Sequence, residues 1–178
     1  MGTPESFAPE KLVMAVLTSR IDRMAEILDG LRDGHGPTDF VSDPIPFTFT
    51  HYYDGEMGGG IMRFFASFQR LIPPDTLAAV KLASNAREER YREGQGRTVN
   101  LDPGLLCLSR FVLATTKEGS HRIPLSAGIY AEVTLMFEKG SFRPLPWTYP
   151  DYKSAPYIEI LNGIRALYKE QVRPARRP

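Results

Sequence analysis

The sequence predicts an α+β fold, in which a mixed or antiparallel sheet carries about three packed helices. Strand-like and helix-like stretches follow the order β-α-β-β-α, then several strands and a closing helix. The composition, 42% hydrophobic and 24% charged over 178 residues, is that of an ordinary globular domain. Two strands between two helices favour a ferredoxin-like βαββαβ core, which the later strands extend. We expect one domain over residues 1–178, with a loose arm at 1–9 and a disordered basic tail at 172–178.

The first strand and helix have the clearest patterns. The run Lys11–Thr18 is apolar almost throughout, which is typical of a strand buried on both faces. Ser19 is a candidate N-cap for a helix whose apolar residues recur at helical spacing over Ile21–Leu31. Gly34 and Gly36 are expected to end this helix.

A hairpin and a second helix are expected next. A loop rich in Pro, Asp and Ser precedes Phe47–Tyr53, which alternates as a strand does. Asp54–Gly60 is a glycine-rich turn, and Ile61–Leu71 resumes strand character, so the three stretches predict a hairpin. Two prolines then open a helix near Asp75, which is expected to end near Arg92.

The second half predicts short strands and a final helix. Asp102-Pro103-Gly104 is a turn signal, because Pro presets φ and Gly supplies positive φ. Strands are expected at Arg110–Thr116 and Ile129–Phe137, the second followed by a hairpin turn at Lys139–Gly140. A stripe at helical spacing marks a helix over Tyr157–Tyr168.

The bulk properties narrow the class of protein. The formal net charge of +1 gives no general attraction to nucleic acid or anionic lipid, so we regard nucleic acid as an unlikely partner. Cys107, the single cysteine, lies in an apolar run and is expected to be a small buried hydrophobe. No signal-peptide pattern and no apolar run of membrane-spanning length occurs, so we expect a cytoplasmic protein without membrane contact.

The sequence contains several longer motifs: Tyr52–Gly58, Val99–Gly104, Leu113–Lys117, His121–Ile123, Gly128–Leu135 and Trp147–Tyr152. Together they resemble the motifs of one prokaryotic family catalogued as a domain of unknown function. The resemblance spans nearly the whole chain between Lys11 and Tyr168 and implies a single-domain cytoplasmic protein with no established activity. Some relatives are loosely labelled GTP-binding. The sequence has no phosphate-binding loop to support that label, because Gly58-Gly59-Gly60 is followed by Ile61-Met62-Arg63.

Polar residues concentrate between Arg97 and Glu132, which makes this stretch the best candidate for a site. Asp102 is expected mainly to cap its own turn, although Arg97 and Asn100 just upstream suggest that the three converge on a ligand. Glu132 interrupts an apolar strand. Simple alternation would place it on an exposed polar face, whereas the functional alternative directs its carboxylate into a cleft.

His121 and Arg122 are adjacent, and each suits chemistry. Histidine transfers protons near neutral pH, and arginine presents a planar fork to phosphate or carboxylate. Adjacent residues on a strand face opposite ways, which argues against both serving one site, but this alternation relaxes at the start of a strand. Glu56, with Asp54, lies on a flexible turn and offers oxygen ligands to a hard cation.

The sequence supports two classes of function. In the first, a small-molecule site takes a nucleotide or another phosphorylated metabolite, with Mg²⁺ as a candidate cofactor. His121, Glu132 and Asp102 would be catalytic, and Glu56, Asp102 and Glu132 would hold the metal. The ligand would contact residues that supply charge, hydrogen bonds or stacking: Arg63, Lys81, Arg97, Asn100, Arg122, Tyr52 and Trp147. In the second, the protein is a non-catalytic interaction or adaptor protein that uses the aromatic Trp147–Tyr152 loop and the basic tail. Whether it is an enzyme stays open, as does its oligomeric state.

Overall fold

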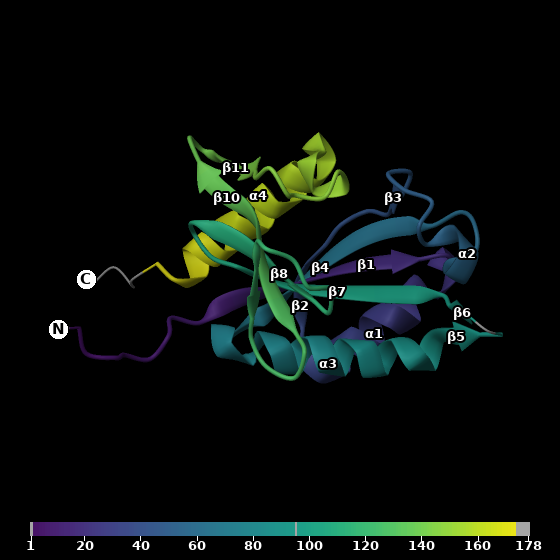
Figure 1. Ribbon diagram of the computed structural model, residues 1–178, viewed down its shortest axis with the longest axis horizontal. Coiled ribbons are helices and arrows are strands. Elements are labelled where there is room, and N and C mark those ends of the chain that lie inside the picture. The colour runs from purple at the N-terminus through teal and green to yellow at the C-terminus, as the bar shows by residue number, and fades with distance from the viewer. Residues whose placement is uncertain (1, 95, 174–178) are drawn as a thin grey trace.

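A computed structural model describes residues 2–94 and 96–173 of the chain. Its centre is the expected ferredoxin-like core (Figure 1). The sheet order is β7-β1-β4-β2, every pair is antiparallel, and a helix follows the first and third strands in the chain. The elements in chain order are β1 (Glu10–Thr18), α1 (Met24–His35), β2 (Thr38–Val41), β4 (Met62–Ile72), α3 (Leu77–Glu88) and β7 (Val99–Leu106).

The later strands extend the sheet beyond β7. They are β8 (Arg110–Thr115), β10 (Tyr130–Glu138) and β11 (Ser141–Pro144), in the sheet order β11-β10-β8-β7. Figure 1 shows β10 turning steeply across the direction of β1, so the sheet is curled. The smaller pieces are β3 (Ile45–Pro46), α2 (Asp54–Met57), the β5–β6 hairpin (Arg92–Glu93 and Gly96–Arg97) and β9 (Arg122–Pro124).

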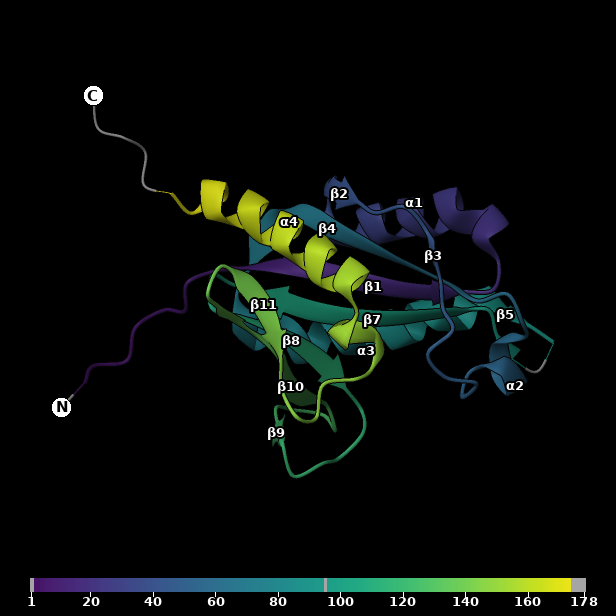
Figure 2. The same cartoon turned by 90° about the horizontal axis from the view of Figure 1, so that it is seen from above.

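Helices cover both faces of the sheet, as the uninterrupted apolar run in β1 requires. Alternate β1 residues such as Met14 pack with α1 and α3 in one cluster, while Val13 and its face pack with the closing helix α4 (Ala155–Gln171) in another. Figure 2 shows α4 lying across the sheet, and Figure 1 shows α1 and α3 on the opposite side. The α+β prediction is confirmed, with short α2 added to the three long helices.

The predicted hairpin is wrong in its first strand. Residues 47–53 form loop and turn, the Asp54–Gly60 turn begins with α2, and β4 instead pairs with β2 and two-residue β3. The aromatic residues that mimicked a strand pack on one another, as Phe47 does on Phe49 and Tyr53. The expected Ser19 cap is also absent, because a 3₁₀ turn at Ile21–Arg23 precedes α1 and neither has a side-chain cap bond.

The predicted turn at Asp102-Pro103-Gly104 is wrong as well, since β7 runs through it. Pairing with β8 begins only at Gly104, so Pro103 lies where β7 is still an edge on that side. Gly104 is required for packing: a Cβ there would lie 2.6 Å from Phe111 Cζ and 2.7 Å from the Val112 carbonyl oxygen. Glycine is therefore needed here because Phe111 and Val112 approach the β7 backbone closely, and not because a turn requires a positive φ.

The chain ends differ in how they meet the domain. Residues 2–9 are exposed and contain no helix or strand. Val172, at the start of the expected tail, packs partly buried against the α4 side of the core, while residues 174–178 lie outside the described residues. Across residues 2–94 and 96–173, no helix has the length and apolar content that spanning a membrane demands.

Candidate functional site

A cavity opens where β7 and β8 separate. The two strands pair only over Gly104–Leu106 and Phe111–Leu113. The start of β7 pairs with β1 and the end of β8 pairs with β10, but these two segments do not pair with each other. The volume of the cavity is about 710 Å³, within the range of small-molecule sites. Its lining comes from β4, α3, β6, β7, β8 and β10 and from the turns and loops beside them: Phe47, Phe49, Thr50, Tyr52, Tyr53, Arg63, Lys81, Asn85, Glu88, Glu89, Arg97, Asn100, Asp102, Leu113, Ala114, Thr115, Thr116, Lys117, Glu132, Tyr149, Pro150, Asp151 and Tyr152.

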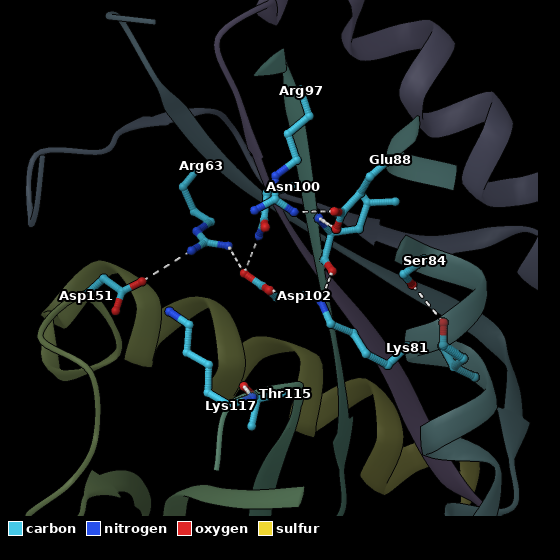
Figure 3. A network of polar contacts seen from close by, with 12 residues as sticks. Arg63, Lys81, Ser84, Glu88, Arg97, Asn100, Asp102, Thr115, Lys117 and Asp151 are labelled. Carbon is cyan, nitrogen blue, oxygen red and sulfur yellow. Dashed lines mark hydrogen bonds and ion pairs between the residues drawn. The ribbon is translucent and has the colours of Figure 1, made fainter. Parts of the chain in front are cut away.

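Arg63 of β4 lines the floor of the cavity, and Figure 3 shows it between Asp102 and Asp151. Its side chain is almost fully buried, and its two terminal nitrogens each lie 3.3 Å from a carboxylate, Asp102 Oδ2 on one side and Asp151 Oδ2 on the other. The guanidinium also faces the Phe47 and Tyr152 rings at 5.5 and 6.0 Å. A buried arginine with two carboxylate partners is how a protein tolerates charge in its interior.

The two aspartates have opposite pKa shifts. Burial raises the pKa of Asp102, but Lys81, Arg63 and a hydrogen bond from Asn100 outweigh burial, so its pKa lies below the ordinary value. Asn100 Nδ2 donates to Asp102 Oδ2 at 2.8 Å, and Lys81 Nζ lies 3.5 Å from Oδ1. Burial raises the pKa of Asp151 more than Arg63 lowers it. Neighbouring carboxyl groups whose pKa values are shifted in opposite directions are common at functional sites.

The α3 side of the cavity is held by Glu88. Its Oε1 accepts a 2.7 Å hydrogen bond from the Leu101 backbone N–H, and its Oε2 pairs with Arg97. Arg97 Nε also lies 2.9 Å from Glu56 Oε1, which ties α2 to this wall. Burial raises the pKa of Glu88 despite Lys81 and Arg97 nearby. Lys81 donates to the Leu101 carbonyl at 2.8 Å, so α3 is fastened to β7 by charged side chains.

Glu132 of β10 forms the opposite wall and is 1% exposed. Its Oε2 lies 2.8 Å from Arg122 Nε and 3.0 Å from His121 Nε2. His121 and Arg122 both contact Glu132, because β9 begins only at Arg122 and the strand alternation that would separate them does not yet apply. The expectation of an exposed polar face for Glu132 is also wrong. His121 stacks on Trp147, with ring centroids 5.3 Å apart.

Aromatic side chains form the mouth of the cavity. Tyr52 is 66% exposed, and the Lys117 ammonium lies over its ring, 4.5 Å from the centroid. Tyr149 accepts a 2.6 Å hydrogen bond from Arg122 Nη2, and burial raises the pKa of its hydroxyl. Burial likewise raises the pKa of Tyr53, so both phenols are neutral donors at physiological pH.

Three lining residues have a buried polar atom that makes neither a hydrogen bond nor an ion pair in the described part of the chain. These atoms are Arg63 Nε, Glu132 Oε1 and Tyr152 Oη. Each such atom costs about 1–3 kcal/mol when it stays unpaired. Unpaired buried groups in native proteins call for a water, an ion or a functional role, and here three of them border one cavity.

The structure brings most of the predicted site residues together and leaves four aside. Tyr52, Lys81 and Arg97 line the cavity, as do Arg63, Asn100, Asp102 and Glu132. His121 and Arg122 sit behind Glu132, Trp147 sits behind His121, and Glu56 sits behind Arg97. The proposed metal ligands Glu56, Asp102 and Glu132 make separate ion pairs. Among residues 2–94 and 96–173, no group of three or more His, Cys, Asp or Glu side chains is placed to hold a metal.

Sequence reasoning missed three residues of this site. Asp151 was not singled out within its aromatic loop, because nothing in the neighbouring sequence marks it as the partner of a buried cation. Lys117 and Tyr149 were also missed. Lys117 lies two residues after the end of β8, in a connecting segment of the kind that often carries functional side chains.

The comparisons with known proteins address the family alone. No curated protein and no solved structure matches this chain. A family model matches residues 8–168, which include every described residue of the cavity. The chain therefore belongs to the family described as "Domain of unknown function (DUF4416)".

Proposed function

We propose that this protein binds a small polar metabolite with a flat ring, of the nucleotide or phosphorylated class, in the cavity between β7 and β8. The observation that carries the proposal is the buried Arg63–Asp102–Asp151 network at the floor of a cavity of about 710 Å³. A plain core would fill this position with apolar side chains, since a buried ion pair adds little stability by itself.

Aromatic residues at the mouth support a flat ligand. Tyr52 is exposed and lines the cavity together with Phe49 and Tyr149. Stacking of a base on an aromatic side chain contributes about 1–3 kcal/mol per base. Asn100 supports recognition of the ring's polar edge: its amide nitrogen is held by Asp102, which leaves its carbonyl oxygen to accept from a ligand.

The same walls would serve acid–base chemistry on a bound ligand. Glu132 would accept a proton through Oε1, and His121 would position it and relay charge through the contact with Oε2. Asp102, whose pKa is lowered, would stay ionised. Mg²⁺ usually binds one or two carboxylates together with ligand phosphates, and in this proposal Asp102 and Glu132 would supply the protein's share.

A binding screen on two matched variants tests the proposal. Thermal shift and calorimetry would cover nucleosides, nucleotides and sugar phosphates, each with and without Mg²⁺. Tyr52→Ala removes an aromatic ring from the mouth at a position 66% exposed, so folding is spared; Phe7→Ala removes one 65% exposed on the N-terminal arm. We expect Tyr52→Ala to weaken binding by about 5- to 100-fold and Phe7→Ala to leave it unchanged. The proposal fails if no compound binds or if both variants bind like the wild type.

A protein partner is the second candidate, favoured by apolar side chains on the outer strand β9 and beside it. Ile123 is 62% exposed, Leu125 43% and Trp147 40%. A partner that docks here should be captured by the wild type and lost with Ile123→Asp. Equal capture by both proteins would contradict an adaptor role for this surface.

A further inference from the structure

The charges around the cavity limit how much negative charge a ligand can bring. Arg63 is held between Asp102 and Asp151, Lys81 contacts Asp102, and Arg97 is held between two glutamates. Each of these cations already has a carboxylate partner at 4 Å or less. A phosphate group bound there would displace a buried carboxylate and leave it unpaired, which is strongly unfavourable.

The Glu132 wall gives the same result. Arg122 Nε contacts Glu132, and the other guanidinium nitrogens of Arg122 donate to the Lys117 and Glu118 carbonyls and to Tyr149. Arg122 therefore has no free donor fork to offer, although its residue type suggested phosphate binding. Neither wall has positive charge left for a chain of phosphates.

Lys117 is the exception. Among the described residues that line the cavity, it is the cation with no carboxylate within ion-pair distance, and its ammonium rests on the Tyr52 ring. Figure 3 shows its side chain reaching toward the Arg63–Asp102 network with no dashed contact from its nitrogen. One unpaired ammonium beside an aromatic face is placed to neutralise about one anionic group on a ligand stacked there.

We infer that the ligand is a nucleoside monophosphate, with Lys117 reading its single phosphate, and not a nucleoside triphosphate. This inference rests on the proposed function and names the ligand within it. A triphosphate carries several negative charges, and even Mg²⁺ would neutralise only part of them. The cavity has a single free cation to balance the rest in the part of the chain that the structure describes.

Calorimetry with matched ligands and variants tests the inference. The full-length protein would be titrated with adenosine, AMP and ATP, and with guanosine, GMP and GTP, each with and without Mg²⁺. Lys117→Met removes the ammonium and keeps the aliphatic length. Lys169→Met removes an exposed lysine on α4, away from the cavity, as the control.

We expect the monophosphate to bind about tenfold more tightly than the nucleoside, and the triphosphate to bind no more tightly than the monophosphate. Lys117→Met should abolish the advantage of the monophosphate and leave nucleoside binding within about twofold, while Lys169→Met changes neither. The inference is overturned if the Mg²⁺–triphosphate binds more tightly than the monophosphate, or if Lys117→Met keeps the full advantage of the monophosphate over the nucleoside. In either case, binding of the nucleoside would still support the proposed function. If no compound of the panel binds, the proposed function itself fails.

Discussion

Replacing Arg63 with methionine tests whether the buried charge network holds the cavity floor together. Methionine keeps much of the side-chain volume and removes the cation, so the change acts mainly on electrostatics. Asp102 keeps Lys81 and Asn100 as partners. Asp151, whose side chain is 8% exposed, makes no other ion pair within the described residues. The variant therefore leaves one buried carboxylate without its counter-ion.

The loss of unfolding free energy in Arg63→Met depends on whether Asp151 stays ionised or takes up a proton. Breaking a buried pair by removing one partner costs about 3–5 kcal/mol. The loss has a ceiling, because the carboxyl can take a proton instead. Protonating a group of ordinary pKa near 4 costs about 4 kcal/mol at pH 7 and about 1.5 kcal/mol at pH 5. We expect Arg63→Met to lose about 3–4 kcal/mol of unfolding free energy at pH 7 and about half of that or less at pH 5.

The sign of this pH dependence is fixed by the direction of the shift. In the variant, the folded-state pKa of Asp151 lies further above its unfolded value than in the wild type. A raised carboxyl pKa contributes stability that is present at low pH and lost as the pH rises through the folded-state pKa. The pKa of Asp151 is already raised in the wild type, because burial raises it more than Arg63 lowers it.

Urea unfolding at pH 5 and pH 7 measures the effect, with Arg70→Met as control. Arg70 is an exposed residue of the same strand, and its replacement should change stability by about 0.5 kcal/mol or less. Adding Asp151→Asn to Arg63→Met should recover about 2 kcal/mol at pH 7, because the stranded charge is gone. A loss below about 1 kcal/mol at pH 7, or an equal loss at both pH values, would refute the reasoning.

Three further changes probe the walls of the cavity. Asp102→Asn should flatten the acid limb of the stability curve below about pH 4, because a lowered pKa contributes stability that is lost as the pH falls; an unchanged limb in acid titration contradicts this. Glu88→Ala should cost about 1–3 kcal/mol in urea unfolding by leaving the Leu101 N–H unpaired, whereas a neutral effect would mean that water replaces it. Gly104→Ala should cost about 1–3 kcal/mol by clashing with Phe111, and the added change Phe111→Leu should reduce that penalty; additive losses would exclude the clash.

The fold was largely predictable because the apolar residues of each long helix or strand follow one clear pattern. The apolar run of β1 and the stripes of α1 and α4 left little choice, and the ferredoxin-like order followed from them. The errors fell where side chains serve the tertiary structure. Phe47 and its aromatic neighbours alternate like a strand yet cluster as a loop, and Pro103-Gly104 has turn composition within a strand. Local propensity cannot report that Phe111 needs the space at Gly104.

The site was predictable in its residue types and less so in its partners. Arg63 and Lys81 were chosen because they supply positive charge, and Asp102 because it lies close to Arg97 and Asn100 in the sequence. Both observations can be made from a single sequence. The ion pairs of these residues join positions up to 88 apart, and no local pattern encodes such a distance. Asp151 was missed for this reason. Its role depends on its ion pair with Arg63, and the spacing of residues within a loop does not reveal a partner so distant in sequence.

The cavity between β7 and β8 has a floor and a mouth, and the two differ in how well they tolerate amino-acid substitutions. The floor stands on hydrogen-bonded strands and α3, where one substitution alters both charge balance and folding. Part of the mouth comes from residues 47–53, whose one hydrogen bond to a neighbouring strand segment, among the residues that the structure describes, runs from the Phe47 N–H to the Ile61 carbonyl. Substitutions in that segment can change which molecules enter while the charged floor stays as it is. Under the proposed function, ligand preference would diversify through a few loop residues, while a separate set of residues controls stability.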